Sequence, residues 1–361
     1  MKYMDEYRDR TLIAGLTKKI RARAGRFYTF MEVCGGHTMA IHKFGLPWLL
    51  PSTIRLKSGP GCPVCVTDQS YVDRAVAYAE MEEVVVCTYG DLLRVPGTSA
   101  SLYDKRGEGC DVRVVYSLLE ALRIAREESS RMVVFLGIGF ETTAPGSAVG
   151  ILEAEQEGLD NFCLLSAHKR MPPAMEAVAS DAGQLDGFIC PGHVSTITGM
   201  GIYEDLPRLY GMGCVISGFE PTDMLESILL LVEQMEAGRP EVAIQYKRAV
   251  RPEGNLKARA LMDQVFQHGD DTWRGLGVLP DSGLRIRPEY ARYDAEQRIP
   301  VEVGPARENA GCICGEILKG QKEPSECPLF ATSCTPVHPV GACMVSSEGA
   351  CQAYYKYRRY A

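Results

Sequence analysis

Residues 132–145 read MVVFLGIGFETTAP, a run of apolar and β-branched side chains that passes directly into a polar loop containing glycine. A short apolar run bounded by turn residues predicts a buried β-strand, here over residues 132–138. Seven other segments share this pattern and are also expected to be strands: residues 27–33, 54–57, 84–88, 112–116, 162–165, 187–190 and 214–217.

Helical periodicity fills several of the gaps between these strands. Apolar residues recur at i, i+3, i+4 and i+7 over residues 72–79, 118–125 and 225–232. The last of these helices is expected to end at Gly238, because Gly followed by Pro240 is a typical helix terminator. Strands that alternate with helices in this way predict an α/β fold with largely parallel sheets.

Length predicts more than one domain. The 361 residues exceed the roughly 250–300 residues at which a single hydrophobic core usually divides. Eight strands are compatible with one large sheet or with two, and we favour two parallel-sheet α/β/α domains, at 1–130 and 131–240. Residues 268–311 are rich in Gly, Pro, Asp and Arg, so 241–361 is expected to be an irregular, cysteine-rich domain that a metal centre helps to hold together.

Composition excludes several classes of protein. Hydrophobic residues make up 46% and charged residues 24% of the chain, which excludes wholesale disorder. The net charge of −7 provides no basic field for extended nucleic-acid binding. No apolar run approaches the ~18 residues of a membrane span, and the N-terminal residues lack the apolar core of a signal peptide. We therefore expect a cytoplasmic protein whose partners are proteins or small molecules.

The 14 cysteines are the most informative part of the composition. A long chain without a signal peptide is expected in a reducing compartment, where metal binding and thiol chemistry are more common than structural disulfides. Five of the cysteines lie in or beside strands without polar loops and are expected to be inert core residues: Cys87, Cys110, Cys163, Cys190 and Cys214.

Four unusual loops each follow a predicted strand. They read CGGHT at 34–38, GPGCPVC at 59–65, GFETTAP at 139–145 and PGHVS at 191–195. Ligands of open parallel sheets bind beyond the carboxyl ends of the strands, so these loops are expected to converge on one cleft. Ordinary turn chemistry is the alternative for any single loop, but each of the four also carries a Cys, His or Glu.

Cys62 and Cys65 form a CxxC pair immediately before a predicted helix, which Thr67 or Asp68 can cap. A thiol near a helix N-terminus is expected to have a lowered pKa and to be redox-active. The alternative is half of a zinc site, but a second CxxC is absent from the sequence. Cys34 lies beside two glycines that permit close approach of a ligand, so it is either a thiolate ligand or nucleophile, or a buried inert cysteine.

The C-terminal cysteines offer a quartet with the spacing C-x14-C-x6-C-x16-C. Four thiolates can hold a [4Fe–4S] cluster or a tetrahedral zinc ion, and the spacing alone does not choose between them. Cys314 and Cys343 are possible substitutes within the set, whose first choice is Cys312, Cys327, Cys334 and Cys351.

Together, these loops and the ending CxC…CPLF…CTP…GACMVSSEGAC resemble the HypD family of [NiFe]-hydrogenase maturation factors over about residues 27–357. The resemblance implies a maturation scaffold with thiol redox activity, a monomer outside its complex, that assembles the Fe(CN)₂CO unit with a HypC-type chaperone and a HypE-type cyanide donor. It implies iron binding at Cys34, redox chemistry at Cys62 and Cys65, and a [4Fe–4S] cluster on the quartet.

The resemblance also implies that His37, Glu141 and His193 are cleft residues, which would position or protonate a cyanide precursor. Two functions from other classes stay open at this point. One is a cluster-dependent protein disulfide reductase, for which Cys34 would be dispensable. The other is a zinc-stabilised interaction protein without redox chemistry.

Overall fold

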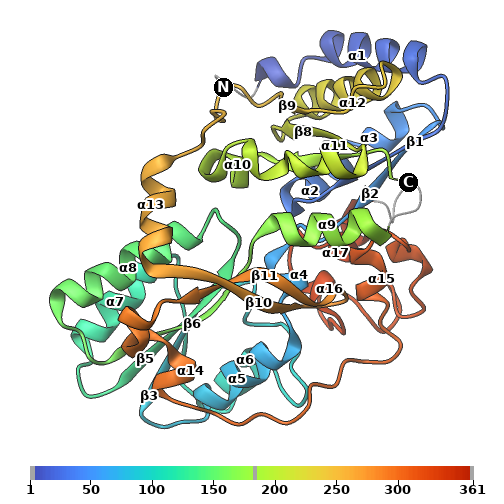
Figure 1. Cartoon of the computed structure of the whole chain (residues 1–361). Coiled ribbons are helices and arrows are strands. Elements are labelled where there is room, and N and C mark those ends of the chain that lie inside the picture. The colour runs from blue at the N-terminus through green and yellow to red at the C-terminus, as the bar shows by residue number, and fades with distance from the viewer. Residues whose placement is uncertain (1–4, 182–184, 358–361) are drawn as a thin grey trace.

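The computed structural model describes residues 5–181 and 185–357, which form two parallel β-sheets in separate lobes (Figure 1). The first sheet has five strands in the order β2-β1-β7-β8-β9. Every neighbouring pair in it is parallel. The strands are β1 (Tyr28–Glu32), β2 (Ile54–Ser58), β7 (Gly187–Pro191), β8 (Gly213–Ser217) and β9 (Val242–Ile244).

The second sheet has four strands in the order β4-β3-β5-β6, and they are also all parallel. They are β3 (Val84–Thr88), β4 (Val112–Val114), β5 (Met132–Gly139) and β6 (Phe162–His168). All eight predicted strands are therefore present, within a few residues of the expected ends. β9 was not predicted, since its apolar run, VAI, is only three residues long.

The sheets do not divide the chain at residue 130 as expected. The chain forms β1 and β2 of the first sheet, then builds the second sheet from β3 to β6, and then returns to place β7 beside β1. The pairing of Phe30 with Gly187 joins strands that are far apart in sequence. Local patterns report a strand and the face that it buries, but they carry no information on its distant partner.

Helices cover the sheets and connect the strands. The local signals are those expected: the Asp68 side chain caps the helix that begins at Gln69, and the helix ending at Glu236 is followed by Gly238 with a φ of +61°. The α-helices are α1 (Arg10–Arg23), α2 (Gly35–Lys43), α3 (Leu46–Leu49), α4 (Pro63–Val66), α5 (Gln69–Ala79), α6 (Leu102–Gly107), α7 (Leu118–Glu127), α8 (Ala144–Glu157), α9 (Met171–Asp181), α10 (Gly192–Thr198), α11 (Asp205–Tyr210), α12 (Pro221–Glu236), α13 (Leu256–Val265), α14 (Ala295–Arg298), α15 (Cys314–Leu318), α16 (Ala342–Val345) and α17 (Ala350–Tyr357).

Short 3₁₀ helices occur at η1 (Asp5–Tyr7), η2 (Gly201–Tyr203), η3 (Pro288–Tyr293) and η4 (Pro324–Glu326). In the described ranges, none of the helices combines the length and the apolar composition that a membrane crossing requires.

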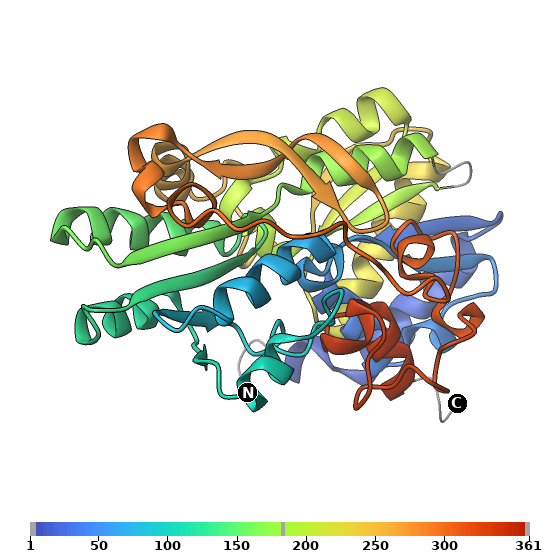
Figure 2. The same ribbon diagram turned by 90° about the horizontal axis from the view of Figure 1, so that it is seen from below.

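An antiparallel hairpin, β10 (Phe266–Trp273) and β11 (Gly277–Ile286), lies where irregular chain was expected. It packs against β6 and α9 and crosses between the lobes in Figure 2. The buried Lys169 ammonium fixes it there by donating to Asp271 Oδ2 at 2.7 Å and to the Thr272 carbonyl at 2.8 Å. Its strands read FQHGDDTW and GVLPDSGLRI, in which Gly, Asp and Pro interrupt the apolar residues, so a search for apolar periodicity does not find them.

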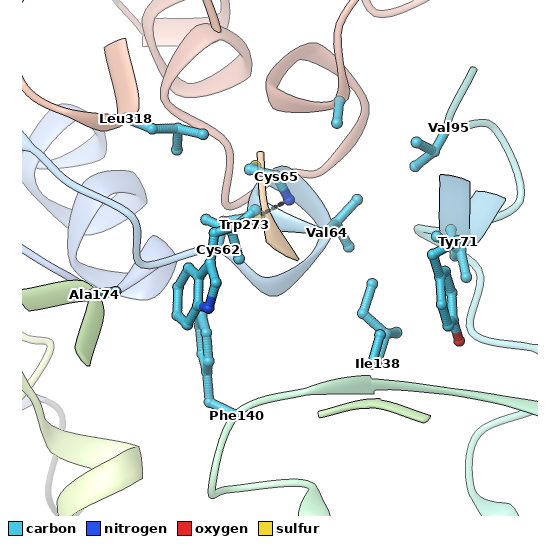
Figure 3. Packing of buried hydrophobic residues seen from close by; sticks show 14 of the residues in the cluster. Cys62, Val64, Cys65, Tyr71, Val95, Ile138, Phe140, Ala174, Trp273 and Leu318 are labelled. Carbon is cyan, nitrogen blue, oxygen red and sulfur yellow. Dashed lines mark hydrogen bonds between the residues drawn. The ribbon is translucent and has the colours of Figure 1, made fainter. Parts of the chain in front are cut away.

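The cysteine-rich segment is part of the central core, not a separate body. Helices α16 and α17 pack against α4 and α2, respectively. Buried residues of α15 to α17 share one hydrophobic cluster with Cys62, Cys65 and strand residues of both sheets. Figure 3 shows part of this cluster around Cys62 and Cys65, with Trp273 of the hairpin and Phe140 below the α4 turn.

Candidate functional site

The CGGHT and GPGCPVC loops follow the adjacent parallel strands β1 and β2 and touch through their backbones. The Gly35 amide donates a 3.0 Å hydrogen bond to the Gly61 carbonyl. A Cβ atom added at Gly61 would come 2.1 Å from the backbone nitrogen of Cys34, closer than any real contact. Glycine at 61 therefore permits the approach of the two cysteine-bearing loops.

Cys34 is half-buried at the N-cap of α2. Burial raises the pKa of its thiol to about 12, the nearby Glu348 carboxylate adds to the rise, and the amides of Gly36 and His37 oppose it. Near neutral pH the side chain is therefore a protonated thiol. The helix N-terminus does not outweigh desolvation here.

Two acidic residues that the sequence did not single out lie beside Cys34. Glu32 is fully buried; its Oε2 accepts the Cys34 amide at 3.1 Å and its Oε1 accepts the Thr38 hydroxyl at 2.5 Å. Burial raises the pKa of Glu32 to about 8. Glu348 comes from the C-terminal segment and lies over Gly35, where an added Cβ would be 2.3 Å from the Glu348 Cβ.

Cys62 and Cys65 are buried free thiols at the two ends of the first turn of α4. The Cys65 amide donates to Cys62 Sγ at 3.3 Å, which is the dashed contact of Figure 3. The sequence predicted a lowered thiol pKa for this pair. For Cys65 that expectation is wrong, because complete burial raises its pKa well above the ordinary value and the short α4 turn does not compensate.

A row of thiols continues from the CxxC pair into the C-terminal segment. The Cys65 thiol interacts with that of Cys343. Cys343 Sγ in turn accepts from Cys314 Sγ at 2.7 Å, and Cys314 interacts with Cys312. Cys314 and Cys343, considered from the sequence as substitutes within the quartet, thus lie between the quartet and the CxxC pair.

The four quartet cysteines lie near one another in the C-terminal segment. The Cys351 thiol lies within electrostatic range of the other three, Cys312, Cys327 and Cys334, and of Cys314. Across residues 5–181 and 185–357, no three histidine, cysteine or carboxylate groups converge on a point suited to a single metal ion. The donor set is four soft sulfur atoms, which fits the ligand requirement of an iron–sulfur cluster.

His37 and His193 come from the loops after β1 and β7, which are neighbours in the sheet. His37 is buried, and its Nε2 lies 3.2 Å from the Ser217 carbonyl and 3.0 Å from the Gly218 carbonyl. Carbonyls only accept, so Nε2 carries the proton. Burial lowers the pKa of His37 to about 4, which makes it a poor proton donor.

His193 is exposed, and burial of part of its ring lowers its pKa below the ordinary value. Phe219, in the loop after β8, stacks against both His37 and His193. Phe219 was not predicted from the sequence. The signal that could have identified it is its position directly after a strand, in a loop that also contains Gly218.

Glu141 follows β5 of the second sheet and does not share the edge occupied by Cys34. Its Oε1 accepts the Met171 amide at the start of α9 at 3.0 Å, and its Oε2 is buried without a hydrogen-bond partner in the described part of the chain. Burial raises its pKa to about 7. It also lies near Tyr203, whose hydroxyl bonds to Ser195 of the PGHVS loop at 2.9 Å.

Comparison with known proteins gives one consistent result. The family model HypD, described as "Hydrogenase formation hypA family", matches residues 11–358. The hydrogenase maturation factor HypD of Azotobacter vinelandii is 49% identical, over 99% of this chain and 97% of that protein. The HypD protein of Cupriavidus necator is 47% identical over 100% and 98%. A putative hydrogenase expression/formation protein of Methanocaldococcus jannaschii is 43% identical over 97% and 98%.

Proposed function

The chain belongs to the HypD family of hydrogenase maturation factors, and we propose that it is the scaffold and thiol redox protein on which the Fe(CN)₂CO unit of a [NiFe]-hydrogenase is assembled. The observation that carries this proposal is the backbone contact between Gly35 and Gly61. It sets the candidate iron ligand, Cys34, in a loop that touches the loop of the Cys62–Cys65 dithiol.

Cys34 is the proposed ligand of the iron cargo. Fe(II) that carries cyanide and CO suits a soft thiolate ligand. On binding, an Fe–S bond replaces the S–H bond of Cys34 and one proton is released. The carboxyl groups of Glu32 and Glu348 disfavour a lone thiolate at this position. Before cyanide is attached, Fe(II) brings two positive charges, so these carboxyl groups, when ionised, favour the first binding of the iron.

The Cys62–Cys65 pair is the proposed redox element. Oxidation of the two thiols to a disulfide releases two electrons and two protons, and reduction takes them up again. Both sulfurs are buried, so the exchange is shielded from solvent thiols. Cys312, Cys327, Cys334 and Cys351 would hold a [4Fe–4S] cluster, which supplies one-electron transfer when it is bound.

The partners follow from this chemistry. One thiolate leaves most coordination positions of the iron to other groups, so a HypC-type chaperone would contribute a second cysteine and a HypE-type protein would deliver cyanide. The partial exposure of Cys34 supports such an approach from outside the chain. We place the protein in the cytoplasm, where thiols are kept reduced, and as a monomer when it is outside the complex.

The test is an infrared spectrum of the protein purified without oxygen together with its HypC-type and HypE-type partners. Cyanide and CO bound to iron absorb where proteins are transparent, so the scaffold should show stretches of both. Supplying the complex with ¹³C-labelled cyanide precursor should shift the cyanide bands. A complex that reduces protein disulfides but never shows these bands would instead be a disulfide reductase.

A further inference from the structure

Phe219 lies between two imidazole rings at the carboxyl edge of the five-stranded sheet. Its ring centroid is 4.6 Å from that of His37, at an interplanar angle of 28°, and 4.1 Å from that of His193, at 24°. Both imidazole rings are therefore stacked against the phenyl ring. The ring of Tyr246 lies 5.9 Å away at an interplanar angle of 89°.

Two glycines make room for this ring. A Cβ atom at Gly36 would come 3.1 Å from Phe219 Cε1, and one at Gly192 would come 3.3 Å from Cε2. Each histidine directly follows one of these glycines in the sequence, as Gly36-His37 and Gly192-His193. Two Gly-His dipeptides from the loops after β1 and β7 thus hold one phenyl ring, with a glycine beside its edge and a histidine on its face.

The loop of Phe219 also determines which ring nitrogen of His37 carries the proton. The carbonyls of Ser217 and Gly218, just before Phe219, receive the Nε2–H of His37. The Nδ1 atom of this ring is buried and has no hydrogen-bond partner in the described ranges. It therefore keeps an unshared lone pair, and one short segment fixes both the plane of the ring and its tautomer.

Neighbouring contacts hold that segment in place. The Gly218 amide donates to Gln245 Oε1 at 3.1 Å. Glu220 pairs with Arg8, whose Nη2 lies 2.8 Å from Glu220 Oε1. The fully buried Asp223 receives two hydrogen bonds from Arg248, at 2.7 and 2.5 Å. These contacts with α12 and with the segment after β9 hold the loop of Phe219 in place. The two histidines then stack against a fixed ring.

The ring is close to the proposed iron ligand. The position of an added Cβ at Gly36 is 3.7 Å from Cys34 Sγ as well as 3.1 Å from Phe219 Cε1. The sulfur and the phenyl ring therefore border the same glycine. Stacked aromatic contacts of this geometry stabilise the arrangement beyond the area they bury.

We propose that Phe219 is a positioning residue, which fixes the imidazoles of His37 and His193 relative to Cys34 during assembly of the iron unit. This inference rests on the proposed function and deepens it. His37 then acts as a hydrogen-bond acceptor through Nδ1 and does not deliver a proton. His193, the exposed member, is the imidazole that can meet the ligands of an incoming iron fragment.

The test compares Phe219→Leu with Phe219→Tyr in the full chain. Leu keeps an apolar side chain but removes the aromatic faces, whereas Tyr retains them. Phe135→Leu, a buried phenylalanine of the second sheet with an edge contact to Tyr89, is the matched control for loss of a core ring. Thermal unfolding of each variant establishes that it is folded.

Two measurements decide the outcome. In the protein without partners, ¹⁵N NMR of the imidazoles should give wild-type His37 tautomer and His193 titration in Phe219→Tyr and Phe135→Leu. In Phe219→Leu the tautomers of His37 should mix and the pKa of His193 should rise toward its ordinary value. In the complex, the infrared bands of iron-bound cyanide should weaken about tenfold in Phe219→Leu alone, as expected for misplaced reacting groups.

Wild-type imidazole signals in Phe219→Leu would overturn the proposal, and so would changed signals with undiminished cyanide bands. If the wild-type complex itself lacks those bands, the proposed function fails. The NMR comparison then decides separately whether Phe219 positions the two histidines.

Discussion

The amide of Gly35 donates to the carbonyl of Gly61 at 3.0 Å, and this contact joins the Cys34 loop to the loop of the dithiol. Neither residue carries a reactive group. Their lack of a side chain nevertheless decides how closely the two loops approach, because any Cβ at Gly61 would overlap the backbone of Cys34. Glycine at these positions therefore permits the close approach of the proposed metal-binding thiol and the proposed redox pair.

Substituting Gly61→Ala should separate the two loops. The added methyl group must displace Cys34, so we expect a loss of about 1–3 kcal/mol in the free energy of unfolding and a loss of iron from the complex. Gly146→Ala in α8 is the matched control, since nothing lies within 4 Å of its added Cβ. Urea unfolding and iron analysis measure the two effects. If Gly61→Ala and Gly146→Ala have the same unfolding free energy and the same iron content, the close approach of the two loops is not needed for stability or for iron binding.

Cys62 and Cys65 should form one intramolecular disulfide after mild oxidation. The structure places the Cys65 amide against Cys62 Sγ within a single helical turn, so the sulfurs are near enough to join after a small rearrangement. Thiol trapping with mass spectrometry should find the bridge in the wild type and in Cys110→Ser, and should not find it in Cys62→Ser. Stoichiometric zinc bound at this pair would contradict a redox role.

Removal of a quartet cysteine should affect metal content and folding together. Cys334 is buried in the core shared by α4 and the C-terminal helices, so Cys334→Ala should abolish bound iron and sulfide and lower stability by several kcal/mol. Cys163→Ala, a buried cysteine of β6, controls for cavity formation alone. Retention of full iron and sulfide in Cys334→Ala would show that the ligand set is wrong.

Glu141 should make stability depend on pH. Its pKa is raised by burial to about 7 in the folded chain, from an ordinary value of 4.5. The folded state therefore holds the proton more tightly, and this contribution is complete below about pH 4.5 and is lost as pH rises to 7. Glu141→Gln should flatten the fall in unfolding free energy over that interval, by up to about 1.4 kcal/mol per pH unit.

Urea unfolding at a series of pH values measures this slope. The exposed Glu289→Gln serves as the surface control and should keep the wild-type profile. Parallel profiles for wild type and Glu141→Gln would mean that the Glu141 carboxyl titrates at its ordinary pKa in the folded protein.

Strands were easier to predict from the sequence than their partners. The apolar run at 132–138 and its seven counterparts are local features, and each became a strand. The placement of β7 beside β1 depends on packing across the whole chain, so a division at residue 130 could not be corrected locally. The hairpin β10–β11 was missed because it is held by contacts such as Lys169 with Asp271, not by an apolar pattern.

The candidate site was also predicted only in part: its motif loops were identified, but the residues that reach it from other segments were not. Four loops were expected to converge on one cleft. Cys34, Cys62, His37 and His193 follow the neighbouring strands β1, β2 and β7, whereas Glu141 of the fourth loop follows β5 in the other sheet. Glu348 reaches the same edge from the GACMVSSEGAC ending, where only the cysteines were singled out, and Phe219 reaches it from a segment in which no motif was recognised. The thiol pKa was misjudged for a physical reason, since sequence indicates a helix N-terminus but not the depth of burial that overrides it.

The central claim is that the Cys34 thiolate holds the iron while cyanide and CO are attached to it. The most direct measurement is the infrared spectrum of the anaerobically purified complex with Cys34→Ser, next to Cys110→Ser, another half-buried cysteine that lies outside the site. The account predicts that Cys34→Ser loses the bands of iron-bound cyanide and CO, because a hydroxyl is a harder donor and stays protonated, while Cys110→Ser keeps them. Full cyanide and CO bands in a folded Cys34→Ser complex that still matures hydrogenase would contradict it.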